Sequence, residues 1–396
     1  MIIKIKEINI FISFFLITIS NSIFLTSLGI NNIFEMIGYI ILIYNVLKSC
    51  RKNIQNINIF LFLFILFTFF IGILLQNNLD WLIKFRLCLS MFIIASISVI
   101  SKGYINSLSE IRIISYSIFS GIIFSIVLAC LGGNDLFTLA VEGSISSLGF
   151  NGGLQHKNYF SVDMIAIFIG LYYYNIYQNK KIWDKIIMIL IVILLLLSNS
   201  RGGYIIFIIF LFISNMRYIK KIKKEQRKIL FGIIIFIGLC ILVYLYNLIL
   251  SNSGSYLIRI IGLVNFINYY SNDWFYIIFG NAEMAFSNID SSYNENVRSV
   301  LGWEGTTELA ILSIFIKNGL IGFIGYILIF LQFIKVILQT ENFKYKIMIC
   351  SILISFIISS SIETYIVNMH IVYGTFCYIA LSGLLGMEYN ERRNKK

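Results

Sequence analysis

The sequence predicts an all-α fold, a polytopic bundle of about 12 membrane-spanning helices. Of its 396 residues, 59% are hydrophobic and only 13% are charged, and the mean hydropathy is +0.87. Soluble globular chains carry about a quarter charged residues, so lipid is the expected surroundings of this chain. Apolar stretches of roughly 20 residues, long enough to cross a hydrocarbon core, recur along the whole length. Residues 1–396 are therefore predicted to form a single integral membrane domain.

The predicted spans follow one another with short connections, apart from two long ones. They lie near 8–28, 33–48, 58–76, 87–101, 113–131, 158–178, 186–199, 202–216, 229–250, 319–337, 347–366 and 370–386. The first segment follows Lys4 and Lys6, as the apolar part of a secretory signal would. It lacks a small-residue cleavage site and further spans follow, so we interpret it as a retained helix. Several spans are short, which implies local thinning of the bilayer.

The basic residues predict which side of the membrane each connection faces. With the N-terminus inside, 24 of the 31 lysines and arginines fall on cytoplasmic segments and seven fall outside. This is a strong positive-inside pattern, and it places both chain ends in the cytoplasm. The net charge of +12 then reports topology and indicates no nucleic-acid partner. The basic run 217–228 is an anchor at anionic lipid. The long connections 132–157 and 251–318 face outward as the expected active-site face.

Metal and nucleotide chemistry are not indicated. The six cysteines are scattered without a CxxC pair, which argues against a disulfide framework or a zinc site. Two histidines are too few for a histidine-rich metal centre. No P-loop, HExxH, GxSxG or dinucleotide-binding glycine pattern is present in the sequence. We therefore predict no cofactor and no metal, and the energy for any reaction must come from the substrate or an ion gradient.

Arginines on the predicted outer segments are the first candidates for a site. Arg201 lies in segment 198–203, between two apolar runs where the chain must turn tightly, and the two glycines after it permit a turn and a close approach to the backbone. Its planar donors match a phosphate or diphosphate. The alternative is an arginine that reaches the lipid interface. Arg259 lies in an apolar stretch, 256–267, that suits a helix resting on the membrane, where a lone arginine is more often an anchor.

A glycine-rich segment leads into the sixth predicted span. It ends in His156, Lys157 and Asn158, and Asp163 follows about one and a half turns later. Glycines followed by these polar residues at a helix start can hold an anionic group near the positive end of the helix. An ordinary capped loop explains the same pattern equally well.

Three glutamates lie close to predicted spans. Glu308 opens an apolar run that breaks at residues 317–319 before a full span resumes. It either stabilises the helix dipole or, if its pKa is raised by shielding, acts as a general base. Glu363 falls near an outer span end, where it can line the same cavity, and Glu35 has no assigned role.

Three of these segments, in this order, resemble the O-antigen ligase and polymerase superfamily. Ser200-Arg-Gly202 is similar to the family's Ser-Arg after a strongly apolar span. Arg259, followed about twenty residues later by Gly280, is similar to the family's arginine and glycine before the later outer loop. Ile-Lys-Asn-Gly-Leu-Ile-Gly at 316–322 is similar to its Glu-x-Gly-Leu-x-Gly, with Lys317 in place of the glutamate. The resemblance covers roughly residues 145–335 and the topology.

One departure bears on the type of enzyme. Ligases of this family carry a His-Asn eleven residues before the glycine at 319, and this chain has Glu308 there. The missing histidine favours a polymerase over a ligase. Gln155-His-Lys-Asn158 is loosely similar to a His-x-Asn-like segment before the family's sixth span.

The resemblance implies a glycosyltransferase-C-like bundle with a large outer loop. Its substrates would be undecaprenyl-diphosphate-linked oligosaccharides, joined on the outer face of the cell inner membrane in a surface-polysaccharide or lipopolysaccharide pathway. Whether a chain-length regulator protein also binds stays open. The diphosphate would be held by Arg201, Arg259, Arg298 and Lys157. The proton of the acceptor hydroxyl would pass to Glu308 or, as the alternative, to His156.

Two other functions stay open. One is an O-antigen ligase that transfers polymer to the lipid A core. The other, from a different class, is a lipid-linked oligosaccharide flippase or transporter. Such transporters usually carry polar groups at the bilayer midplane and two related halves, and the sequence displays neither pattern.

Overall fold

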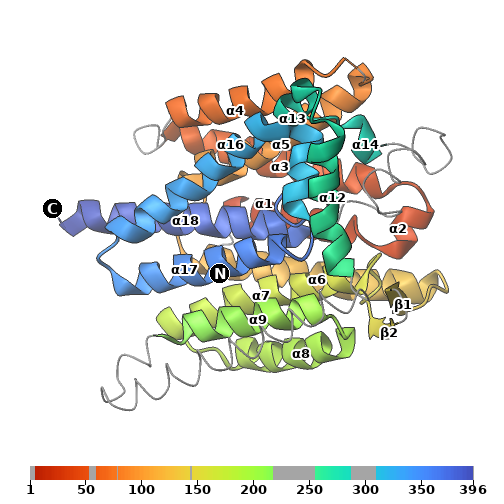
Figure 1. The fold of residues 1–396 in the computed structure, drawn as a ribbon. Helices are drawn as coiled ribbons and strands as arrows, with labels where there is room; N and C mark the ends of the chain where they lie inside the picture. Colours follow the sequence, from red (N-terminus) through yellow and green to blue (C-terminus); the bar gives the residue numbers. More distant parts are fainter. Residues whose placement is uncertain are drawn as a thin grey trace, which may run out of the picture.

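A computed structural model of the chain describes residues 5–52, 59–77, 79–142, 145–216, 255–286 and 309–395. In this part of the chain nearly all regular structure is helical (Figure 1). In chain order the helices are α1 (Ile5–Ile19), α2 (Ile23–Ser27), α3 (Asn31–Lys52), α4 (Ile59–Leu74), α5 (Trp81–Val99), the 3₁₀ helix η2 (Ile100–Gly103), α6 (Leu108–Leu131), α7 (Lys157–Tyr177), α8 (Ile182–Ser198), α9 (Arg201–Ser214), α12 (Ser255–Tyr269), α13 (Trp274–Phe279), α14 (Glu283–Phe286), α16 (Ala310–Gln339), α17 (Phe343–Ser360) and α18 (Val372–Lys395). The predicted all-α class is confirmed.

Five of the described helices are long and apolar enough to cross a membrane. They are Trp81–Gly103, Leu108–Leu131, Lys157–Tyr177, Ala310–Gln339 and Phe343–Ser360. Two shorter apolar helices, Ile59–Leu74 and Arg201–Ser214, add to this set. A membrane protein is thus supported by length and composition, while the count of 12 spans stays a prediction. The predicted span 229–250 lies outside the described residues.

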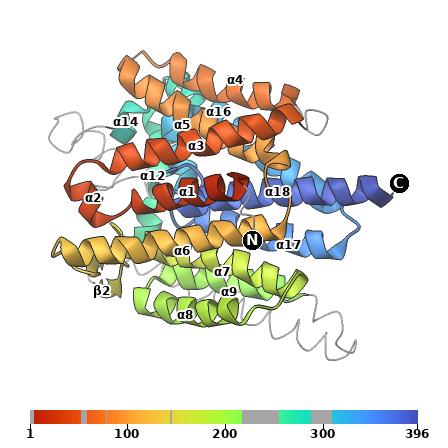
Figure 2. The same cartoon turned by 180° about the vertical axis from the view of Figure 1, so that it is seen from behind.

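The helix α18 lies at the centre of the bundle. Every residue from 371 to 388 is buried, and α18 contacts α5, α7, α16, α17 and η2. Around it α1 packs on α3 and α6, α6 on α7, α7 on α8, α9 on α17, and α4 on α16 (Figures 1 and 2). Because small residues line α18, neighbouring backbones approach closely: a Cβ on Gly386 would lie 1.8 Å from the carbonyl oxygen of Lys102.

The connections gather into two groups at opposite ends of the bundle. At one end, where α18 finishes, Lys6 pairs with Glu110, and Arg392 donates to the carbonyl of Gln339 at 2.6 Å. At the other end, which carries α2 and the β-hairpin, Gln155 donates to Thr26 at 2.7 Å (Figure 1). The first group holds segments predicted as cytoplasmic and the second holds segments predicted as outer. Which end faces the cytoplasm stays a prediction.

Two predicted spans have different bounds in the structure. The segment 8–28 is two helices, α1 and α2, because Ser20–Ser22 form a turn whose hydrogen bonds tie it to the glycine-rich segment at 153–155. The span predicted at 87–101 begins earlier, at Trp81. The helix can include the two basic residues of its first turns because Arg86 is exposed on the helix surface and Lys84 is buried beside a backbone carbonyl. Lys84, for example, donates to the carbonyl of Leu74 at 3.2 Å.

The segment 132–157, predicted as outer, contains a β-hairpin. Strand β1 (Phe137–Glu142) pairs antiparallel with β2 (Ile145–Phe150), with Phe137 opposite Phe150. Their rings meet edge to face at 5.4 Å, and Phe150 also contacts Phe160 of α7 at 5.2 Å. These aromatic contacts fix the hairpin on the start of α7.

The segment 251–318, predicted as outer, is largely helical where the structure describes it. As the apolar stretch 256–267 suggests, α12 forms, and it runs across the direction of the long helices (Figure 1). The following span begins at Ala310, nine residues before the predicted 319, so Lys317 lies in a helix and not in a loop. Gly319 adopts φ 62° and ψ −164°, which breaks α16 at the position where the sequence pattern breaks.

Candidate functional site

The starts of α7 and α9 lie side by side at the end of the bundle that carries the hairpin. Ser200, the N-cap of α9, donates from Oγ to Asn158 Oδ1 of α7 at 2.9 Å and accepts from the Gly203 amide at 3.3 Å. Helix N-termini carry unpaired amides and a partial positive charge, so two of them side by side favour an anion. This pair of helix starts is the candidate site.

The turn between α8 and α9 differs from the expectation in one respect. Asn199 takes the left-handed conformation, at φ 48°, and so makes the tight turn that we expected the glycines to permit. A short polar side chain tolerates this conformation. Gly202 and Gly203 instead permit close packing: a Cβ at Gly202 would lie 2.9 Å from Ile362 Cγ2, and one at Gly203 would lie 2.7 Å from Ser161 Oγ.

Arg201 is the most accessible of the predicted site residues whose side chains the structure describes. It is the first residue of α9, its side chain is exposed, and it makes no hydrogen bond or ion pair with any residue that the structure describes. A guanidinium that is free and carried at a helix start is available to a ligand with two acceptor oxygens.

His156 and Lys157 have structural surroundings of their own. His156 is the N-cap of α7, and its Nδ1 accepts the amide of Asn158 at 3.1 Å. Lys157 is 3% exposed and packs on Gly149 of β2, where an added Cβ would lie 2.7 Å from Lys157 Cδ. The capped-helix interpretation therefore accounts for both residues. Their roles in chemistry stay predictions.

The remaining predicted site residues are placed only in part. Arg259 lies on α12, near the end of that helix opposite the one packed on α13 and α16, and its side chain is outside the description. Arg298 and Glu308 lie outside the described residues. Leu309, directly after Glu308, is buried with Phe266 of α12 and Leu312 of α16.

Glu363 joins the candidate site from a distant part of the sequence. It lies between α17 and α18, and its Oε1 accepts from Asn158 Nδ2 at 3.0 Å. Asn158 thus bridges Glu363 and Ser200. The sequence placed Glu363 near an outer span end but gave no sign of its partner, since 205 residues separate it from Asn158.

Gln76 is a structural residue that sequence reasoning missed. From the end of α4, its Nε2 donates to the carbonyls of Phe279 at 2.7 Å and Lys317 at 3.0 Å, and its Oε1 accepts from the amide of Ala282 at 2.7 Å. One amide side chain therefore holds the α13–α14 connection against the broken helix α16. A lone glutamine after an apolar run carries no signal of this role.

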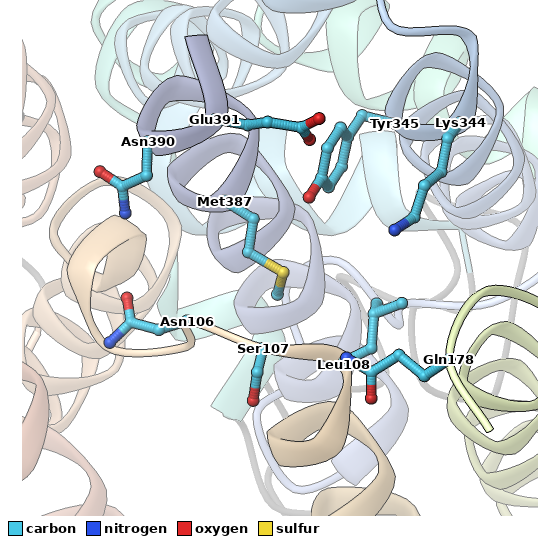
Figure 3. A pocket seen from close by; sticks show the side chains of 9 residues that line it. All are labelled: Asn106, Ser107, Leu108, Gln178, Lys344, Tyr345, Met387, Asn390 and Glu391. Carbon is cyan, nitrogen blue, oxygen red and sulfur yellow. The ribbon is translucent and has the colours of Figure 1, made fainter. Parts of the chain in front are cut away.

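A polar pocket of about 350 Å³ lies at the opposite end of the bundle (Figure 3). It is lined by Asn106, Ser107, Leu108, Gln178, Lys344, Tyr345, Met387, Asn390 and Glu391. Its charged groups have neighbours of their own: Glu391 accepts from Asn342 at 3.3 Å, and the Lys344 ammonium lies 5.2 Å from the Tyr177 ring. We interpret this pocket as polar packing where α6 and α17 begin and α7 and α18 end.

A scan of the sequence against models of known protein families finds no match. No curated protein matches the chain either.

Proposed function

We propose that this chain is a membrane glycosyltransferase, a polymerase that joins undecaprenyl-diphosphate-linked oligosaccharide repeat units into a surface polysaccharide such as O-antigen. The observation that carries the proposal is Arg201 at the start of α9, beside the start of α7: it is exposed, and no described residue pairs with it. It adds to the ordered sequence resemblance over residues 145–335. An exposed arginine at one of two adjacent helix N-termini suits a diphosphate, the leaving group of this reaction.

The proposal includes the topology. Twelve spans with both ends in the cytoplasm would place this site on the periplasmic face of the inner membrane of a Gram-negative cell. The contacts that group the outer segments at one end of the bundle support this arrangement. Substrate would reach the site from the outer leaflet.

In the proposed reaction, a hydroxyl of the acceptor repeat unit attacks the anomeric carbon of the donor glycan. The bond between that carbon and the phosphate oxygen breaks, and undecaprenyl diphosphate leaves with the electron pair. Arg201 and Arg259, with Arg298 or Lys157, would stabilise the developing charge on the diphosphate. The anomeric phosphate bond supplies the energy, in keeping with a sequence that carries no nucleotide-binding motif.

The first experiment is deletion of this protein in its source strain, followed by gel analysis of the surface lipopolysaccharide or capsule. The polymerase proposal expects core plus a single repeat unit in the deletion strain, and long chains restored by the wild-type protein. Long chains that accumulate on the lipid carrier would instead indicate a ligase. Loss of all outward-facing repeat units would indicate a flippase.

A further inference from the structure

The backbone around Glu363 is fixed by packing, close to the start of α9 that carries Arg201. Its amide donates to the carbonyl of Ser359 at 2.9 Å, so the residue continues the last turn of α17. Two residues later, Tyr365 is 2% exposed, and a Cβ on Gly374 of α18 would lie 2.3 Å from its carbonyl oxygen. The backbone on both sides of Glu363 is therefore packed against the centre of the bundle.

The connection between α17 and α18 approaches the residues on both sides of Arg201, Ser200 through Asn158 and Gly202 directly. Glu363 reaches Ser200 through Asn158, with heavy-atom distances of 3.0 and 2.9 Å. Ile362 packs on Gly202, where even a methyl group would come within 2.9 Å. A carboxylate and an exposed guanidinium are thus presented by neighbouring segments at one surface. A base and an anion-binding group on neighbouring segments are two of the groups that such a reaction needs.

Glu363 belongs to a small polar network at the end of the bundle that carries the hairpin. Burial first, and then the charge of Glu363, raises the pKa of the Tyr365 hydroxyl. Asn158, which donates to Glu363, has its own oxygen satisfied by Ser200. Asn158 is therefore held in the orientation that presents its amide group to Glu363.

We propose that Glu363 is the general base of the polymerase reaction, an assignment that rests on the proposed function. The proton of the acceptor sugar hydroxyl passes to the Glu363 carboxylate as that oxygen bonds to the anomeric carbon. The bond from the anomeric carbon to the phosphate oxygen breaks, and the leaving diphosphate is bound by Arg201. Asn158 and Ser200 are positioning residues, since they orient Glu363 relative to the start of α9 without touching the reacting atoms.

This assignment differs from the sequence-based candidates for the base. His156 already uses Nδ1 to accept a helix amide, which commits that nitrogen to capping α7. Glu363, in contrast, is the acid whose contacts join it to both helix starts of the site. Glu308 remains the sequence-based alternative, and the experiment below tests it in parallel.

The decisive variant is Glu363→Gln. Glutamine keeps an oxygen that can accept from Asn158 Nδ2 but cannot take up a proton at neutral pH. A structural role that depends on the Asn158 contact would therefore survive this change, and a general base would not. Glu341→Gln is the control, because Glu341 is also a glutamate in a helix connection, exposed and at the opposite end of the bundle.

The assay uses the full-length protein in detergent with lipid-linked repeat units isolated from the deletion strain. For Glu363→Gln we expect kcat to fall by about 10²–10⁴-fold, with KM and the affinity for undecaprenyl diphosphate within about threefold of wild type. The acidic limb of the pH–rate profile should also disappear. Glu341→Gln should match wild type in every measurement.

Three outcomes would overturn the assignment. Activity of Glu363→Gln close to wild type would exclude Glu363 as the base, and loss in Glu308→Gln alone would transfer the role to Glu308. A joint loss of kcat, undecaprenyl diphosphate binding and melting temperature would leave Glu363 a structural role only. Wild-type protein that makes no polymer from these units would overturn the proposed function itself, and the assignment with it.

Discussion

Glu35 of α3 and His370 of the α17–α18 connection form an ion pair, with 2.6 Å between Oε2 and Nδ1. Asn21 donates to the carbonyl of the same histidine, so two polar contacts fasten the start of the chain to this connection. The sequence assigned Glu35 no role, and the ion pair supplies one. His370 is seven residues from Glu363, so this contact also steadies one end of the candidate site.

The Glu35–His370 pair predicts a pH dependence of stability. The hydrogen bond to Glu35 raises the pKa of His370 above its ordinary 6.5, against burial and the charge of Lys317, which lower it. The stabilisation is therefore complete below pH 6.5 and is lost as the pH rises through the raised pKa of the folded protein. Because the His370 side chain is 58% exposed, we expect at most about 1 kcal/mol.

Melting temperatures in detergent, measured from acidic to alkaline pH, test this expectation with His370→Gln as the reference. Wild type should melt higher than the variant at acidic pH, and the difference should shrink as the pH rises. A difference that is constant across the range would show that the pair does not titrate.

The ion pair between Arg112 and Asp184, at the other end of the bundle, should make a large contribution to the stability of the protein. Asp184 is fully buried at the start of α8 and accepts from Arg112 at 2.9 and 2.7 Å and from Asn175 at 3.0 Å. Removal of the guanidinium leaves a buried carboxylate without its counter-charge. Arg112→Met should therefore cost about 3–5 kcal/mol in the free energy of unfolding.

Arg112→Lys keeps the charge but not the two-pronged geometry, so its loss should be smaller. Lys185→Ala, at an exposed position on the same helix start, should change the midpoint little. Denaturation in mixed micelles measures all three variants. Equal midpoints for Arg112→Met and Lys185→Ala would contradict the expected burial of this pair.

A methyl group at Gly319, where α16 breaks, should lower the stability of the protein strongly. At Gly319, the φ of 62° with ψ of −164° lies in a region that essentially only glycine adopts, at a cost of roughly 1–3 kcal/mol for alanine, and a Cβ would also lie 2.3 Å from the carbonyl oxygen of Ile278. Gly133 has φ 66° but nothing within 4 Å of the added Cβ, so Gly133→Ala measures the cost of a positive φ without a clash.

Gly319→Ala should lower the melting temperature clearly more than Gly133→Ala does. It should also speed hydrogen exchange in α13, because the clash forces α13 away from α16. Equal losses in the two variants would mean that the close approach of these two helices has no energetic weight.

Substitution of Arg201 or Arg259 should remove activity without lowering the amount of protein in the membrane. Arg201→Ala and Arg259→Ala should abolish long surface chains while abundance and membrane insertion stay at the wild-type level. Loss of one charge-stabilising donor typically costs about 10²–10³-fold in rate. Arg86→Ala is the matched control, an exposed arginine on α5 away from the candidate site. Normal chain lengths in both test variants would refute the role of these arginines.

Much of the helical framework was predictable from hydropathy, because each span needs only its own apolar residues to be stable in lipid. The bounds were less predictable. Lys84 and Lys317 suggested loop positions, yet both lie on helices. Lys84 is accommodated there because its ammonium donates to the carbonyl of Leu74, a partner that only tertiary packing supplies. Hydropathy also gave no sign of the hairpin at 137–150, whose stability depends on aromatic contacts with α7.

The candidate site was predictable only in its separate parts. Arg201 stood out because it is a basic residue outside the predicted cytoplasmic segments. The role of its neighbours could not be read from the sequence, because Asn158, Ser200 and Glu363 meet across 42 and 205 residues. Local pattern carries no information about such distant hydrogen bonds.

The sequence by itself determined the class of this protein, an α-helical chain for a lipid environment, since apolar length and charge distribution act locally and add along the chain. It also determined where α16 breaks, because Lys317, Asn318 and Gly319 interrupt the apolar run. Only the tertiary structure decided which polar groups share a surface. Which polar groups meet depends on how the helices pack. Glu363 pairs with Asn158, and Glu35 pairs with His370, because polar groups at packed helix ends form their hydrogen bonds within the protein.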